Sequence, residues 1–120
     1  MSKKILIAED EEHIAKIIKF KLEKNGYEVI HCSNGKDALA SIISEKPDLV
    51  LLDVMMPGMN GFEVLKEMKA HPEVERIPVI MLTALGQETD TVKGFDLGVK
   101  DYIVKPFRTA ELLSRVNRFL

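Results

Sequence analysis

The stretch LLDVMMPGMNG, residues 51–61, decides the fold because it joins a buried strand to a loop and then to a helix. The run DLVLL (48–52) is apolar on both faces, as expected of a central strand in a parallel sheet. Asp53 follows it directly, and a carboxylate at that depth costs free energy unless it has a partner. Pro57, Gly58 and Gly61 then mark a loop. The rest of the sequence should therefore supply a partner for Asp53.

Strand and helix patterns alternate upstream of this stretch. KKILIA (3–8) and YEVIHC (27–32) are short runs rich in branched residues, and they predict strands. Apolar residues at helical spacing lie between them: Ile14, Ile17, Ile18 and Leu22. That helix should end at about Asn25–Gly26, because glycine suits the left-handed position after a helix end. A second helix is expected between Asn34, a good N-cap, and Pro47, which bars its continuation.

The same alternation continues downstream. Asn60, followed three positions later by Glu63, predicts a capping box for a third helix. PVIML (78–82) and YIV (102–104) predict two further strands, with a weaker helix over 87–97 between them. The start of the final helix stays open from sequence. Arg108 is a poor N-cap, whereas Thr109 is a good one that would begin the helix one residue later.

Five strands alternating with five helices predict an α/β fold, a doubly wound open parallel sheet covered on both faces. Right-handed crossovers place all the strand-to-helix loops along one edge of such a sheet. Ligands bind at that edge, beyond the carboxyl ends of the strands. The 120 residues suit one domain, and we expect residues 1–120 to form it.

The bulk composition argues against several classes of protein. A net charge of -2, with 46% hydrophobic and 30% charged residues, does not indicate nucleic-acid binding or membrane insertion. No apolar run approaches the ~20 residues that a membrane helix needs, and no signal peptide is evident. The single cysteine, Cys32, cannot form an internal disulfide, which favours a reducing, cytoplasmic location.

Chemically distinctive residues follow the predicted strands on one edge of the sheet. The first strand delivers Glu9 and Asp10, the third Asp53, the fourth Thr83 and the fifth Lys105. Three carboxylates this close would repel one another without a cation, and oxygen ligands suit Mg²⁺, with Mn²⁺ as an alternative. The three histidines, His13, His31 and His71, share no ligand spacing and are assigned no catalytic role.

Such a pocket suits a tetrahedral dianion, because phosphoryl transfer chiefly requires positioning and electrostatic stabilisation. Aspartate can itself be the nucleophile and become an aspartyl phosphate. We therefore interpret Asp53 as a phosphoacceptor, with Glu9 and Asp10 as metal-binding residues. Lys105 and Thr83 are expected to contact the phosphoryl oxygens.

Four stretches together resemble the signatures of the receiver domain of two-component response regulators: LIAEDE, LVLLDVMMPGMNGFEVL, PVIMLTA and GVKDYIVKPF. The resemblance covers essentially the whole chain in the right order. It implies the flavodoxin/CheY-like sheet of order 2-1-3-4-5. It also implies Mg²⁺-dependent transfer of a phosphoryl group to Asp53 from a sensor histidine kinase or a phosphotransfer protein.

The resemblance further implies residue roles. Asp10, Asp53 and the backbone carbonyl of Met55 would bind Mg²⁺, and Glu9 would hold it through water. The peptide bond before Pro106 is usually cis in the family. Such a domain assists only its own phosphorylation and dephosphorylation, so we do not expect an enzyme in the usual sense.

Signalling in the family couples phosphorylation to movement of Thr83 and Tyr102. This would remodel the face built from the expected helix at 87–97, the strand at 102–104 and the final helix. Tyr102 is otherwise a half-buried strand aromatic, and that alternative stays open. Asp101, Glu111 and Arg115 match the charged interface through which relatives form homodimers on phosphorylation, whereas Lys100 stands where many of them carry an acid.

Two positions near the predicted site carry apolar side chains where a polar one could assist hydrolysis of the phosphoryl group. Met55 and Leu85, two residues after Asp53 and Thr83, cannot orient an attacking water, which predicts a long-lived phosphoryl group.

Other functions on such a chain fit less well. A flavin carrier needs a phosphate-cradling loop where this chain has AEDEE, and an aspartyl-phosphate hydrolase needs an acid where Met55 stands. A receiver-like scaffold without phosphorylation is disfavoured by the intact Asp53, Thr83 and Lys105.

Overall fold

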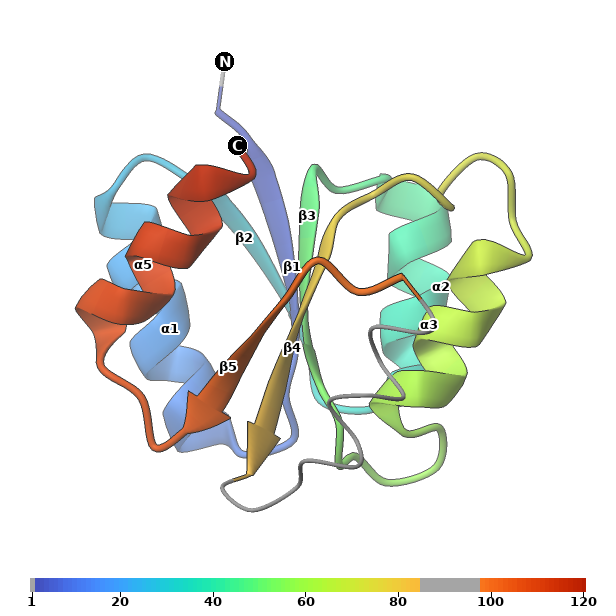
Figure 1. Cartoon of the computed structure of the whole chain (residues 1–120), viewed down its shortest axis with the longest axis horizontal. Helices are drawn as coiled ribbons and strands as arrows, with labels where there is room; N and C mark the ends of the chain where they lie inside the picture. Colours follow the sequence, from blue (N-terminus) through green and yellow to red (C-terminus); the bar gives the residue numbers. More distant parts are fainter. Residues whose placement is uncertain (1, 85–97) are drawn as a thin grey trace.

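The computed structural model describes residues 2–84 and 98–120. The strands are β1 (Lys4–Ala8), β2 (Glu28–Cys32), β3 (Leu49–Asp53), β4 (Val79–Ala84) and β5 (Asp101–Lys105). The helices are α1 (Glu12–Lys24), α2 (Gly35–Glu45), α3 (Gly61–Lys69) and α5 (Thr109–Arg118). The strands form one parallel sheet in the order β2-β1-β3-β4-β5, so the sheet order is confirmed (Figure 1). The helix expected at 87–97 and the role given to Leu85 lie outside the described residues.

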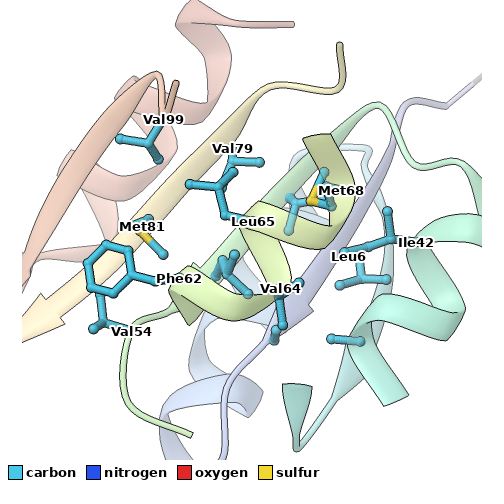
Figure 2. Close-up of a cluster of buried hydrophobic side chains, with 14 of the residues drawn as sticks. Leu6, Ile42, Val54, Phe62, Val64, Leu65, Met68, Val79, Met81 and Val99 are labelled. Atoms are coloured by element: carbon cyan, nitrogen blue, oxygen red, sulfur yellow. The ribbon is translucent and has the colours of Figure 1, made fainter. Parts of the chain in front are cut away.

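The helices cover both faces of the sheet, as a doubly wound fold requires. Helices α1 and α5 lie on one face and α2 and α3 on the other (Figure 1). Each face has its own hydrophobic cluster, because the central strands are apolar on both sides. Figure 2 shows the cluster under α2 and α3, where Phe62, Leu65 and Met68 pack against the strands. None of the helices described here has both the length and the apolar character needed to cross a membrane.

Local capping explains where the helices begin. Oδ1 of Asn34 accepts a hydrogen bond from the Asp37 N–H at 2.8 Å, as the N-cap prediction for α2 requires. The capping box of α3 is complete, with both bonds between Asn60 and Glu63 at 3.0 Å. Helix α5 begins at Thr109, and Arg108 occupies its N-cap without a side-chain hydrogen bond. The open question about this helix is thereby answered in favour of the earlier start.

The strands run further toward the functional edge than the apolar runs predicted. β3 includes Asp53, β4 includes Thr83, and β5 includes Lys105. Their registers pair Asp53 with Leu82 and Thr83 with Val104, so the polar residues stay in the ladder. The sequence boundaries were too short because they ended each strand where the apolar side chains end. The functional side chains therefore project from rigid strands, and this limits their positional freedom.

Candidate functional site

The carboxyl ends of three strands bring charged side chains together. Glu9 and Asp10 follow β1, Asp53 ends β3, and one carboxylate oxygen from each lies within 4.8 Å of the others. Glu9 and Asp53 are buried, whereas Asp10 is exposed. The structure thus gathers the three carboxylates that the sequence placed at one edge of the sheet.

Asp53 has the partner that its burial demands. Its Oδ2 accepts a hydrogen bond from Nζ of Lys105 at 3.0 Å, and its Oδ1 accepts one from the Met55 N–H at 3.2 Å. Only 4% of Asp53 is exposed, so the charge-assisted bond from the ammonium offsets the cost of burying the carboxylate. Lys105 reaches it from the edge strand β5, and the peptide bond between Lys105 and Pro106 is cis.

Lys105 also contacts a second carboxylate, which the sequence did not predict. Its Nζ lies 2.7 Å from Oε1 of Glu9, forming an ion pair that lacks hydrogen-bond geometry. Burial alone would lower the pKa of Lys105, but Glu9 and Asp53 together raise it above its ordinary value. Because β1 and β5 are not neighbours in the sheet, only the folded side-chain positions reveal this pairing.

Glu9 is the most buried ionisable group of the site, with no exposed surface. Its Oε2 accepts a hydrogen bond from the Glu11 N–H at 3.1 Å. Among the described residues, none donates a hydrogen bond to its Oε1. Burial first, and then the Asp53 carboxylate beside it, raise the pKa of Glu9 to about 7, while Lys105 partly opposes the rise.

These residues fit a hard divalent cation. The donor set of Glu9, Asp10 and Asp53 is entirely oxygen, and within the described residues these three carboxylates either share the single ammonium of Lys105 or have no cation. Mg²⁺ and Mn²⁺ prefer such ligands. Met55 is 60% exposed, and its N–H bond to Asp53 keeps its backbone close to the cluster.

The two residues expected to act as a switch are both buried strand residues. Thr83 in β4 is 2% exposed, and Tyr102 in β5 is 7% exposed. Tyr102 belongs to the cluster under α2 and α3, opposite Met81 of the neighbouring strand. It is therefore more deeply buried than a half-buried strand aromatic.

The three residues expected at a homodimer interface contact one another within the chain. Nη1 of Arg115 donates to both Asp101 oxygens, at 2.8 and 2.9 Å. Nη2 of Arg115 lies 3.8 Å from Oε2 of Glu111. This network links β5 to α5, and Lys100 beside it is exposed.

Gly61, which the sequence placed in the loop after Asp53, has a role at the site that the sequence did not predict. A Cβ added to it would lie 2.4 Å from the carbonyl oxygen of Asp53. Helix α3 can start directly against the end of β3 only because this position has no side chain. In the sequence, this position is only a glycine that follows a capping asparagine, and that pattern does not indicate a close approach to Asp53.

The sequence matches the family model of the response regulator receiver domain over residues 5–117. The chain belongs to this family. The match spans every strand described above except the first residue of β1. The acidic cluster and Lys105 thus lie within a receiver domain.

Solved structures resemble this receiver domain along its whole length. A putative response regulator from Chloroflexus aurantiacus is 34% identical, with a TM-score of 0.94, over 99% of this chain and 98% of that one. The chemotaxis response regulator CheY4 of Vibrio cholerae is 31% identical, with a TM-score of 0.94, over all of both chains. The receiver domain of a signal transduction histidine kinase from Syntrophus aciditrophicus is 38% identical, with a TM-score of 0.91, over 99% and 90%.

Proposed function

We propose that this receiver domain accepts a phosphoryl group on Asp53 from a phosphohistidine of a sensor histidine kinase or a phosphotransfer protein. The observation that carries the proposal is the contact of Nζ of Lys105 with Oδ2 of Asp53, at 3.0 Å, beside a cluster of three carboxylates. An ammonium and a cation-binding cluster around one buried aspartate suit the charges that develop in phosphoryl transfer.

In this reaction a carboxylate oxygen of Asp53 attacks phosphorus, and the bond between phosphorus and the donor imidazole nitrogen breaks. The nitrogen keeps the electron pair and can then take up a proton. Lys105 stabilises negative charge on the transferred oxygens, and Thr83 donates its hydroxyl to one of them. The domain turns over no free metabolite, and so it is a signalling domain rather than an enzyme in the usual sense.

Asp10, Asp53 and the Met55 carbonyl would hold Mg²⁺, with Mn²⁺ as an alternative, and Glu9 would hold it through water. When bound, the cation supplies positive charge to the phosphoryl oxygens. The all-oxygen donor set, with one carboxylate oxygen of each residue within 4.8 Å of the others, supports this assignment.

Output is proposed to pass through Thr83 and Tyr102 to the surface of β5 and α5, together with the expected helix at 87–97. Phosphorylation shifts the population between two arrangements of this face only if the phosphoryl group interacts more favourably with one of them. The arrangement that it favours can form a homodimer through Asp101, Glu111 and Arg115, which already form a network in one chain. We place the domain in the cytoplasm, without direct nucleic-acid binding or membrane insertion.

Incubation with acetyl phosphate and Mg²⁺, followed by intact-mass measurement, tests the proposal. The wild type should gain one phosphoryl group, whereas Asp53→Ala, and the wild type in EDTA, should gain none. A gain by Asp53→Ala would place the acceptor elsewhere. No gain by the wild type, together with no Mg²⁺ binding in calorimetry, would instead indicate a receiver-like scaffold.

A further inference from the structure

The turn after β1 is held by a histidine that belongs to none of the sites described so far. The Glu9 N–H donates to the carbonyl of Cys32 at 3.0 Å, which continues the ladder between β1 and β2. The Glu9 carbonyl lies 2.8 Å from Nε2 of His31, a half-buried residue of β2. A carbonyl can only accept, so Nε2 carries the hydrogen and donates it.

The histidine stands where the ladder of backbone bonds stops. In a parallel ladder, the next donor to the Glu9 carbonyl would be the Asn34 N–H, two residues after Cys32. Asn34 instead adopts the N-cap geometry of α2, with its side chain bound to the Asp37 N–H at 2.8 Å. The imidazole of His31 therefore donates to the Glu9 carbonyl in place of the Asn34 N–H.

This bond holds the peptide plane that joins Glu9 to Asp10, the two residues of the turn that carry carboxylates. The Glu9 carbonyl and the Asp10 nitrogen belong to one rigid peptide unit, so a donor on the carbonyl fixes the direction in which the chain leaves β1. Rotation of this unit would change the direction in which the chain continues, and so it would move Asp10, whose carboxylate oxygen lies within 4.8 Å of those of Glu9 and Asp53. Metal ligands must be held to about 0.5 Å to bind well.

We propose that His31 is a positioning residue of the cation site, which it supports by hydrogen-bonding the Glu9 carbonyl, without itself being a metal ligand. This rests on the proposed Mg²⁺ site. The ring nitrogen that faces the site is already a donor to the backbone, and the cluster consists of Glu9, Asp10 and Asp53. Loss of such supporting hydrogen bonds typically weakens metal binding by 10–100-fold where the partner is a ligand side chain. Because His31 acts through the backbone, we expect a loss of about tenfold.

Calorimetric titration of the unphosphorylated protein with MgCl₂ tests this. We expect His31→Ala to raise the Mg²⁺ dissociation constant by about tenfold. His31→Gln, whose amide N–H can replace the imidazole donor, should stay within about twofold of the wild type. His71→Ala is the matched control, because His71 is a half-buried loop residue that pairs with Glu73 and contacts none of the carboxylates of the site. Urea unfolding in EDTA shows whether each variant is folded.

A second measurement needs no metal. The Glu11 N–H is bonded to Oε2 of Glu9, so hydrogen exchange at this amide reports the order of the turn. It should be faster in His31→Ala than in His31→Gln or the wild type. Wild-type Mg²⁺ affinity in His31→Ala, or an equal loss in His31→Gln, would overturn the role of His31. Absence of Mg²⁺ binding by the wild type would instead overturn the proposed function, and the Glu11 exchange rates would still decide whether His31 orders the turn.

Discussion

Glu9 should make the stability of the metal-free domain depend on pH in an unusual direction. Its pKa rises from 4.5 to about 7 on folding, so the folded chain binds more protons than the unfolded chain between these values. Its contribution to stability is then fully present below about pH 4.5 and is lost as the pH rises through about 7. Urea unfolding in EDTA from pH 5 to 8 should show this loss in the wild type but not in Glu9→Gln.

The comparison of these two proteins isolates one group, because all other carboxylates titrate in both. The Gln side chain keeps the size of Glu9 and an oxygen for the Glu11 N–H, but it carries no charge to bury. If the difference in unfolding free energy between wild type and variant stays constant across this range, folding does not raise the pKa of Glu9.

Met55 should govern how long a phosphoryl group stays on Asp53. Met55 is 60% exposed beside the acceptor, and a thioether cannot orient an attacking water. Met55→Asn should speed the loss of phosphate from the Mg²⁺-loaded protein by about tenfold, less than the 10²–10⁴ of a general base, because an amide only positions water. Autodephosphorylation followed by intact mass checks this, with Met55→Leu as control. An unchanged rate in Met55→Asn would contradict it.

The sequence named the charged residues of the site but could not say which would touch. Asp53 needed a partner because of its depth, and Lys105 at the same edge was the cation available. The second contact of Lys105, with Glu9, depends on side-chain conformations that span several strands. The bond from His31 was missed for a related reason. Its acceptor is a backbone carbonyl, which leaves no trace in a pattern of side chains.

At the scale of an element, helix α3 affects the acceptor because its first residue, Gly61, packs against the backbone of Asp53. In Gly61→Ala the new methyl group would meet the Asp53 carbonyl at 2.4 Å and the Met81 side chain at 2.8 Å. We expect overpacking to cost about 1–3 kcal/mol and to reduce phosphorylation of Asp53 by displacing its loop. Chemical unfolding and acetyl phosphate labelling measure the two effects.

The neighbouring cap provides the control for this helix. Asn60→Ala removes a hydrogen bond to Glu63 and should cost about 1 kcal/mol, without placing an atom against β3. If the two variants lose stability equally and label Asp53 equally well, Gly61 matters only for the helix and not for the site.

For the elements within residues 2–84 and 98–120, identity followed from the sequence, whereas some element ends did not. Capping side chains located the starts of α2 and α3, because Asn34 and Asn60 make local bonds that depend on sequence neighbours alone. Helix α5 starts after Arg108 without such a bond, so packing of its apolar face determines the start. The ends of β3, β4 and β5 depend on ladder bonds to adjacent strands, which an apolar run does not encode.

At the scale of the whole molecule, the fold was predictable because both faces of the sheet must be covered. Strands that are apolar on both sides, alternating with amphipathic helices, allow few other arrangements. Strand order is different, since alternation alone does not specify it, and the resemblance to receiver domains supplied it. The order observed places β1 and β3 side by side at the centre, and this brings Glu9 and Asp10 beside Asp53.

Lys105 links the edge strand to this centre, and its loss should be partly compensated by metal. In Lys105→Met the buried carboxylates of Glu9 and Asp53 lose their ammonium, so the metal-free protein should lose about 1–3 kcal/mol of unfolding free energy. Mg²⁺ should bind this variant more tightly than the wild type, because no ammonium competes for the same oxygens. Binding stabilises the folded state by an amount that grows with the logarithm of the ratio of free Mg²⁺ to Kd, so tighter binding should shrink the deficit in excess Mg²⁺. Urea unfolding in EDTA and in Mg²⁺ measures this, with the exposed Lys100→Met as control. Weaker Mg²⁺ binding by Lys105→Met would show that the lysine assists the cation rather than competing with it.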